Sequence, residues 1–152
     1  MREERAKPWL LDINVLLGVL WPSHSFHRQA RHWFESHRRE GWATCPFTET
    51  GFLRVVTNPA FTAEPPRLAD ACKILAAIKQ SSPDYRFWAA DISGEAALES
   101  LGQRLTGHRQ VADAYLLALA IRNRGALVTF DRRILQLAPE GGAERACLKI
   151  LE

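Results

Sequence analysis

Short apolar runs alternate along the chain with longer segments that have a helical period. Trp9-Leu10-Leu11 is apolar throughout and ends at Asp12, which is typical of a buried parallel strand, and the apolar stretch after it predicts a helix. In residues 25–40 the apolar positions recur at i, i+4, i+7 and i+8, which predicts an amphipathic helix that ends at Gly41. The chain is therefore expected to open as strand, helix, helix.

The same alternation continues to the C-terminus. Asn58-Pro59 predicts the end of one helix, and Ser93 predicts the cap of a later one. Further strands are expected at 42–45, 87–90, 126–130 and 148–151, and further helices at 48–57, after Pro66 (with Leu68, Cys72, Leu75 and Ile78 on one face), at 93–105, at 111–124 and at 132–137. This order predicts one domain over residues 1–152, an α/β/α sandwich around a mainly parallel sheet.

The composition is that of an ordinary globular domain. The 152 residues are 47% apolar and 24% charged, with 20 Lys and Arg, 17 Asp and Glu, and a net charge of +3. These values argue against a disordered chain, and the mild positive charge neither requires nor repels a nucleic acid. Cys45, Cys72 and Cys147 are widely spaced and odd in number, so we expect free thiols in a reducing compartment.

The N-terminal segment has two features of a secretion signal, a charged start and an apolar run after it. Asp12 and Asn14 interrupt that run, no small-residue cleavage site follows it, and it is too short to span a bilayer. We therefore expect a cytoplasmic protein without membrane contact.

Four acidic residues are expected at one edge of the sheet. Asp12 and Asp131 follow apolar strands, and Glu49 and Asp113 lie near the starts of helices. In an open α/β sheet the ligand lies beyond the carboxyl ends of the strands, which is the edge where these residues fall. Two carboxylates about 4 Å apart repel by about 4 kcal/mol at an effective dielectric constant of about 20, so the four must take up protons, separate or bind a cation.

The donor types indicate which cation. Oxygen ligands without a thiolate or a nearby His favour Mg²⁺ or Mn²⁺ over zinc. Such an ion polarises a phosphoryl oxygen and lowers the pKa of a bound water molecule, which suits the hydrolysis of a phosphodiester.

Four segments in order then carry a resemblance to a known family: LLDINVLL, TETGFLRVVTNP, HRQVADAYLLALA and LVTFDRR. Together they resemble the PIN-domain family and, within it, the VapC ribonuclease toxins. The resemblance implies a metal-dependent endoribonuclease that acts on RNA, forms a homodimer and is blocked by an antitoxin protein. It assigns catalysis and metal binding to Asp12, Glu49, Asp113 and Asp131. It also implies that Asn14 and Thr129 orient a water molecule or a carboxylate beside them.

Basic residues flank the acidic ones. Arg132 and Arg133 directly follow the last acid and Arg109 precedes the buried helix, so we expect all three to contact RNA phosphates. A second basic segment over residues 24–39 contains four of the five histidines and four arginines. A solvated helix face is expected there, with RNA contact as the alternative. Only two of these histidines share a helix face, which disfavours a zinc site.

Other interpretations stay open. A single acid after a strand is more often a helix cap or turn residue than a ligand, although Asp113 inside an apolar helix needs a cation or donors. A haloacid-dehalogenase-like phosphatase uses a DxD pair, but Asn14 replaces its second acid. A phosphoryl-receiver domain uses a strand-end lysine, and no Lys lies between Lys79 and Lys149. A further alternative is a PIN-type domain for RNA processing or RNA binding that is not a toxin or is not catalytic.

Overall fold

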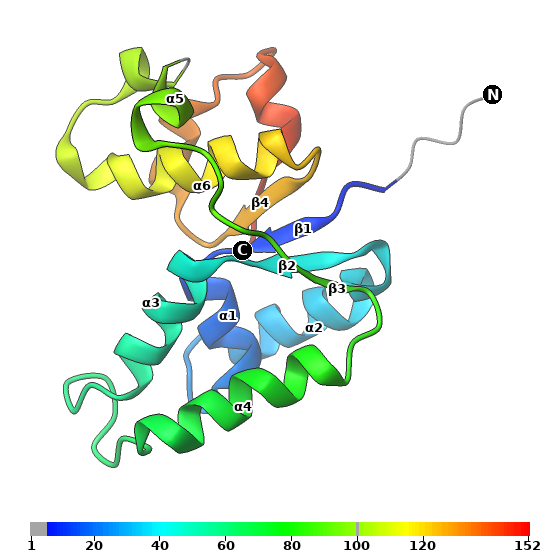
Figure 1. Cartoon of the computed structure of the whole chain (residues 1–152), viewed down its shortest axis with the longest axis vertical. Coiled ribbons are helices and arrows are strands. Elements are labelled where there is room, and N and C mark those ends of the chain that lie inside the picture. Colours follow the sequence, from blue (N-terminus) through cyan, green and yellow to red (C-terminus); the bar gives the residue numbers. More distant parts are fainter. Residues whose placement is uncertain (1–5, 100) are drawn as a thin grey trace.

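A computed structural model describes residues 6–99 and 101–152 and shows five parallel strands in one sheet (Figure 1). The order across the sheet is β3-β2-β1-β4-β5, so the chain begins in the middle, builds outward to β3 and then returns to the other side of β1. The strands are β1 (Trp9–Leu11), β2 (Trp42–Thr44), β3 (Tyr85–Phe87), β4 (Ala126–Thr129) and β5 (Leu148–Ile150). The predicted α/β/α sandwich with a parallel sheet is confirmed.

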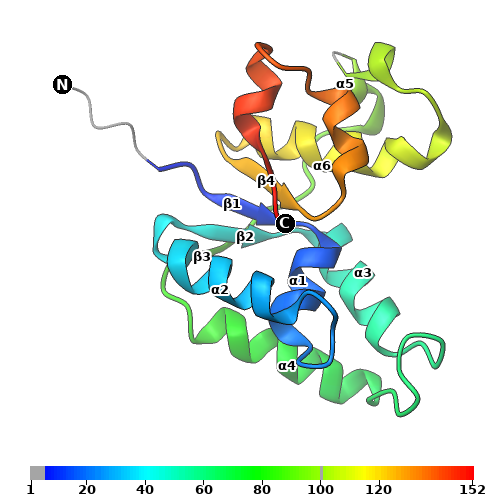
Figure 2. The same cartoon turned by 180° about the vertical axis from the view of Figure 1, so that it is seen from behind.

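The helices cover the two faces of this sheet in chain order, as Figures 1 and 2 show. One layer contains α1 (Ile13–Leu20), α2 (His27–His37), α3 (Pro46–Val56) and α4 (Leu68–Gln80). The other contains α5 (Gly94–Leu98) and α6 (Val111–Arg122), together with the 3-10 segments Gly102–Arg104, His108–Gln110, Arg132–Leu137 and Ala143–Cys147. A further 3-10 turn, Arg38–Glu40, follows α2.

Each face has its own apolar core because alternate strand residues point to opposite sides. Leu11 of β1 packs with α1 to α4, whereas Leu10 packs against α6, as does Trp88 from the segment after β3. Strands β1, β2 and β4 are covered on both faces and are buried almost throughout, so their residues are apolar except for Thr44 and Thr129, which end β2 and β4. Within the described residues no helix is long and apolar enough to span a membrane.

Two glycines fix local geometry: Gly41 lies before β2 at the amino ends of the strands, and Gly51 lies beyond the carboxyl ends, where the acids are. Gly41 has a φ of 100°, in the left-handed region, and lets the chain turn from the 3-10 segment into β2. At Gly51 of α3, a Cβ atom would lie 2.2 Å from the Cδ1 atom of Ile13, so glycine allows α3 to pack against α1. The two helices that follow β1 and β2 are therefore held close together.

Three local predictions differ from the structure. The third strand is Tyr85–Phe87 and not 87–90, because Tyr85 pairs with Trp42 while Trp88 already belongs to the core on the other face. The predicted apolar face of α4 is wrong at its start, since Leu68 is 60% exposed and Cys72 is exposed, and the helix packs instead through Ala71 and Leu75.

The helix predicted over 93–105 is also interrupted. Residue 100 lies outside the described residues, and on either side of it the structure has α5 and then the 3-10 segment that starts at Gly102. Glycine inside a helix costs about 1 kcal/mol relative to alanine, which favours an early end. Ser93 does cap α5, because its hydroxyl accepts the N–H of Ala96.

Candidate active site

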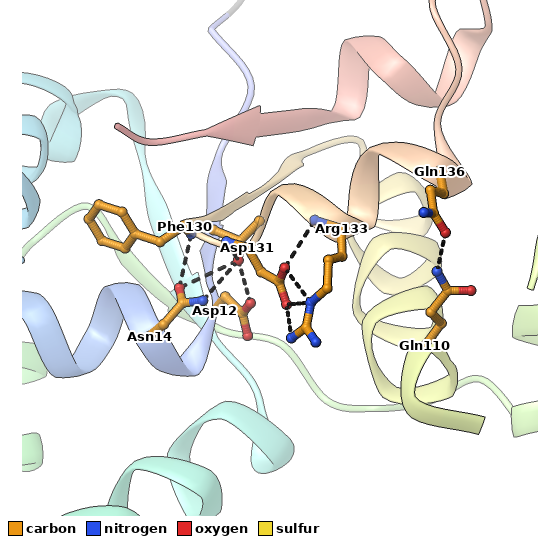
Figure 3. Close-up of polar contacts among 8 residues, drawn as sticks. Asp12, Asn14, Gln110, Phe130, Asp131, Arg133 and Gln136 are labelled. Atoms are coloured by element: carbon orange, nitrogen blue, oxygen red, sulfur yellow. Dashed lines mark hydrogen bonds and ion pairs between the residues drawn. The ribbon is translucent and has the colours of Figure 1, made fainter. Parts of the chain in front are cut away.

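The two central strands bring the first and last acids together. β1 and β4 are parallel neighbours with Leu11 opposite Val128, so Asp12 and Asp131 both lie beyond the carboxyl ends of these strands. The N–H of Asp12 donates to the carbonyl of Val128 at 3.0 Å, which continues the pairing up to the acid. Figure 3 shows the two carboxylates as neighbours at this edge.

Asp12 is buried and fixed by neutral donors. One carboxylate oxygen accepts the N–H of Ile13 at 2.8 Å, which caps α1, and the other accepts the hydroxyl of Thr129 at 2.6 Å. The side chain is 7% exposed, and this burial raises the pKa of Asp12 despite both hydrogen bonds. Asp12 is therefore a desolvated acid with no positively charged residue among these hydrogen-bond partners.

Asn14 and Thr129 hold the turn between the two acids. The Asn14 carbonyl oxygen accepts the N–H of Phe130 at 3.1 Å, and its amide nitrogen donates to the Thr129 hydroxyl oxygen at 3.1 Å. That hydroxyl oxygen also accepts the N–H of Asp131 at 3.1 Å. Asn14 and Thr129 thus fix the backbone that carries Asp131 and the rotamer of Asp12 (Figure 3).

Asp113 lies in the first turn of α6, on the same edge. Its pKa is raised to about 6, first by burial and then by the nearby charges of Asp12 and Asp131, while the charge of Arg133 opposes them. Asp113 also lines a pocket together with Arg133, the ion-pair partner of Asp131, so α6 places this third acid on the same side of the site. We call Asp12, Asp113 and Asp131 the aspartate cluster.

Asp131 has a cationic partner. The guanidinium of Arg133 donates to both of its carboxylate oxygens, with the shortest contact at 2.8 Å, and the N–H of Arg133 donates to one of them at 3.0 Å. The side-chain hydrogen bonds from Arg133 lower the pKa of Asp131. Arg133 is itself 73% exposed, so solvent screens this pair and another cation can compete with it.

Glu49 is turned toward different partners. It lies in the first turn of α3, where one carboxylate oxygen contacts the Lys79 ammonium at 2.5 Å and accepts the Thr44 hydroxyl at 2.8 Å. The Tyr85 hydroxyl is 3.4 Å from the same oxygen. The structure therefore brings Asp12, Asp113 and Asp131 together, whereas Glu49 is neutralised by a lysine at the end of α4.

The aspartate cluster fits a hard divalent cation by its chemistry. Its donors are carboxylate oxygens, two of its acids have raised pKa values because of burial, and among the described residues the ion pair to it comes from Arg133. Among the described residues, no three His, Cys, Asp or Glu side chains already stand as a preformed metal cage. Magnesium keeps several of its own waters, so a rim of carboxylates suits it without such a cage.

Comparison with known proteins identifies the family. The family model described as "PIN domain" matches residues 9–139. The chain belongs to the PIN-domain family. Ribonuclease VapC38 of Mycobacterium tuberculosis (strain ATCC 25618 / H37Rv) is 42% identical to it over 131 residues, which cover 86% of this chain and 90% of the relative. Ribonuclease VapC39 (strain CDC 1551 / Oshkosh) is 39% identical, covering 89% and 96%, and Ribonuclease VapC44 of that strain is 38% identical, covering 90% and 94%. The predicted resemblance to VapC-type PIN toxins is confirmed.

In this PIN domain the three predicted RNA-binding arginines have different surroundings. Arg109 and Arg133 line a pocket of about 320 Å³ that also contains Asp113. Arg132 points elsewhere and pairs with Glu152 at 2.9 Å on the surface. The histidines of the second basic segment are partly structural, since a ring nitrogen of His27 contacts the Gly18 carbonyl oxygen at 2.7 Å.

Two groups in this PIN domain were not predicted from the sequence. One is the set of partners around Glu49, which comes from β2, α4 and β3 and has no local signature. The other is the amide pair of Gln110 and Gln136 beside the aspartate cluster, where the Gln110 nitrogen donates to the Gln136 oxygen at 2.8 Å. Both groups depend on contacts between segments that are far apart in the sequence. The predicted start of α6 is the one sequence feature that lies near the amide pair.

Proposed function

We propose that this chain is a VapC-type endoribonuclease that uses Mg²⁺ or Mn²⁺ held by Asp12, Asp113 and Asp131. The observation that carries the proposal is the aspartate cluster, in which burial raises the pKa of two of the acids and the exposed Arg133 pairs with the third. The names of the relatives, which are ribonucleases, support the substrate class. Glu49 would bind the ion only if its ion pair with Lys79 were broken.

The chain's own residues divide the work of the reaction. A bound Mg²⁺ or Mn²⁺ supplies Lewis acidity toward the phosphoryl group and an activated water molecule. Asp12 is held in one rotamer by Ile13 and Thr129, so it would keep its position when the substrate binds. Arg133 would leave Asp131 for an RNA phosphate once a divalent cation neutralises that acid, because its pair is exposed.

The family membership also motivates proposals about partners. We infer that the chain is cytoplasmic, forms a homodimer and is inhibited by a small antitoxin encoded next to it. Co-expression with the product of the adjacent reading frame, followed by size-exclusion chromatography, tests both associations. A complex that loses ribonuclease activity and regains it on separation supports the antitoxin, and a monomer under all conditions contradicts the homodimer.

The direct test of the activity is RNA cleavage with defined metal ions. We expect cleavage with Mg²⁺ or Mn²⁺, none with EDTA, and little with Ca²⁺, which binds with longer bonds of about 2.3–2.6 Å and acidifies water less. Asp91→Asn is the control variant and should keep this metal dependence, since Asp91 pairs with Arg122 at the surface. Full activity in EDTA, or equal activity with Ca²⁺ and Mg²⁺, would contradict the proposal, and RNA binding without cleavage would favour the non-catalytic alternative.

A further inference from the structure

The pocket beside Asp113 contains more than arginines. It has a volume of about 320 Å³ and lies between the start of α6 and the 3-10 segment that follows β4. Arg109 and Arg133 supply positive charge, and Gln110 and Gln136 supply neutral amides. Because Asp113 is one of its walls, a nucleotide in this pocket would directly adjoin the aspartate cluster.

The orientation of the two amides follows from a backbone group. The N–H of Thr106 can only donate, and it lies 2.8 Å from one terminal atom of Gln110, so that atom is the carbonyl oxygen. The nitrogen of Gln110 is therefore on the other side, where it lies 2.8 Å from Gln136 and must meet its oxygen. The remaining terminal atom of Gln136 is then its NH₂ nitrogen.

This chain of hydrogen bonds leaves a donor available at the pocket. Gln136 is exposed, and Figure 3 shows its nitrogen on the side that faces Arg133. An amide NH₂ group donates hydrogen bonds and cannot accept them. It matches the O6 atom of guanine or the O4 atom of uracil, whereas adenine and cytosine present an NH₂ donor at the corresponding position.

We propose that this pocket binds one nucleotide of the RNA next to the cleaved bond and that Gln136 selects a keto base, guanine or uracil, through its NH₂ group. The inference rests on the proposed ribonuclease function and adds a residue that determines base preference. Arg109 holds the phosphate of that nucleotide, and Gln110 positions Gln136 without touching the base.

A binding experiment tests the site without cleavage. Each of the four nucleoside 5′-monophosphates, and ribose 5-phosphate, is added to ¹⁵N-labelled protein in EDTA, and the Gln136 side-chain NH₂ signal is identified by its loss in Gln136→Glu. We expect this signal to shift with GMP and UMP more than with AMP and CMP. No shift with any nucleotide, or the same shift with ribose 5-phosphate as with GMP, would overturn the proposal.

Cleavage of matched RNAs tests the preference. The RNAs differ at one nucleotide beside the cleaved bond, and Gln136→Glu keeps an acceptor for Gln110 while it replaces the NH₂ donor by a carboxylate oxygen. We expect a keto preference of about tenfold in the wild type that is lost or reversed in Gln136→Glu and kept in Gln80→Glu, the same change on exposed Gln80 at the end of α4. Equal preferences in wild type and Gln136→Glu would overturn the inference. If the wild type cleaves no RNA, the ribonuclease function fails and the nucleotide titration alone decides the site.

Discussion

Two acidic sites at the same edge of the sheet differ in what balances their charge. At Glu49 the balance is internal, with the Lys79 ammonium at 2.5 Å and the hydroxyl groups of Thr44 and Tyr85 around it. At Asp12 the hydrogen-bond donors are a backbone N–H and a threonine hydroxyl, and the neighbouring charges are two further aspartates. The charge of Glu49 is balanced within the chain. In the aspartate cluster Asp131 pairs with Arg133 while Asp12 has neutral donors, so an added cation would lower the repulsion there.

The difference shows that a carboxylate's position in the fold is not enough to define its role. Both sites follow a strand and begin a helix, and the sequence pattern treats them alike. The distinction comes from α4, which ends beside Glu49 and places a lysine there. In physical terms, a paired carboxylate stabilises the fold, and a crowded unpaired one stores repulsion that a divalent ion can relieve.

The largest expected effect is on catalysis at the unbalanced site. Asp12→Asn should lower RNA cleavage by roughly a hundredfold or more, because it removes one charged oxygen donor from the aspartate cluster. The fold should be kept, since the amide is nearly isosteric and asparagine caps a helix about as well as aspartate. The measurements are the cleavage rate and the circular dichroism spectrum. Cleavage at the wild-type rate would reduce Asp12 to a helix cap.

A change at the Glu49–Lys79 pair should alter the stability of the fold instead. Lys79→Met should lower the free energy of unfolding by about 1–3 kcal/mol, because it leaves Glu49 half-buried without its charged partner. Adding Glu49→Gln should restore part of that loss, because the amide needs no counter-ion. Urea denaturation of the two variants checks this, and Lys73→Met on the exposed part of α4 is the control. An unchanged midpoint in Lys79→Met would show that the ion pair contributes nothing.

The pH dependence separates the two sites in metal-free protein. The folded pKa of Asp113 is about 6 against an unfolded value of about 3.9, so the folded state holds the proton more tightly. Its contribution to stability is fully present below about pH 4 and is lost as the pH rises through about 6. Between about pH 4.5 and 7 in EDTA, we expect the wild type to lose on the order of 1 kcal/mol more unfolding free energy than Asp113→Asn. Parallel curves for the two proteins would contradict the raised pKa of Asp113, which comes first from burial and then from the charges of Asp12 and Asp131.

The smallest expected effect concerns RNA contact. Arg109→Ala should weaken RNA binding several-fold and reduce the slope of log K against log salt by about one, because one phosphate contact is lost. Arg122→Ala, which removes a surface ion pair with Asp91, is the matched control and should change neither quantity. If affinity and slope are unchanged in Arg109→Ala, the RNA follows another surface, with the basic residues of 24–39 as the next candidate.

Much of the fold could be predicted from the sequence because strands buried on both faces are apolar over nearly their whole length. Trp9–Leu11 and Ala126–Thr129 are such strands, and they place Asp12 and Asp131 correctly at the edge of the sheet. The third strand was predicted too far along the chain, because the apolar residues that follow it pack on the opposite face of the sheet. The partners of the acids could not be predicted, since Lys79 and Arg133 are recognised only once the helix ends are placed in space.

The most direct test of the central claim is the melting temperature of metal-free protein as Mn²⁺ is added without RNA. The account predicts a rise of roughly 5–10 °C for the wild type at about a hundred times the dissociation constant. It predicts a much smaller rise for Asp12→Asn, and a rise at least as large as that of the wild type for Lys79→Met, in which Glu49 is released. No rise in the wild type, or the same rise in Asp12→Asn, would contradict the claim that the aspartate cluster binds the metal.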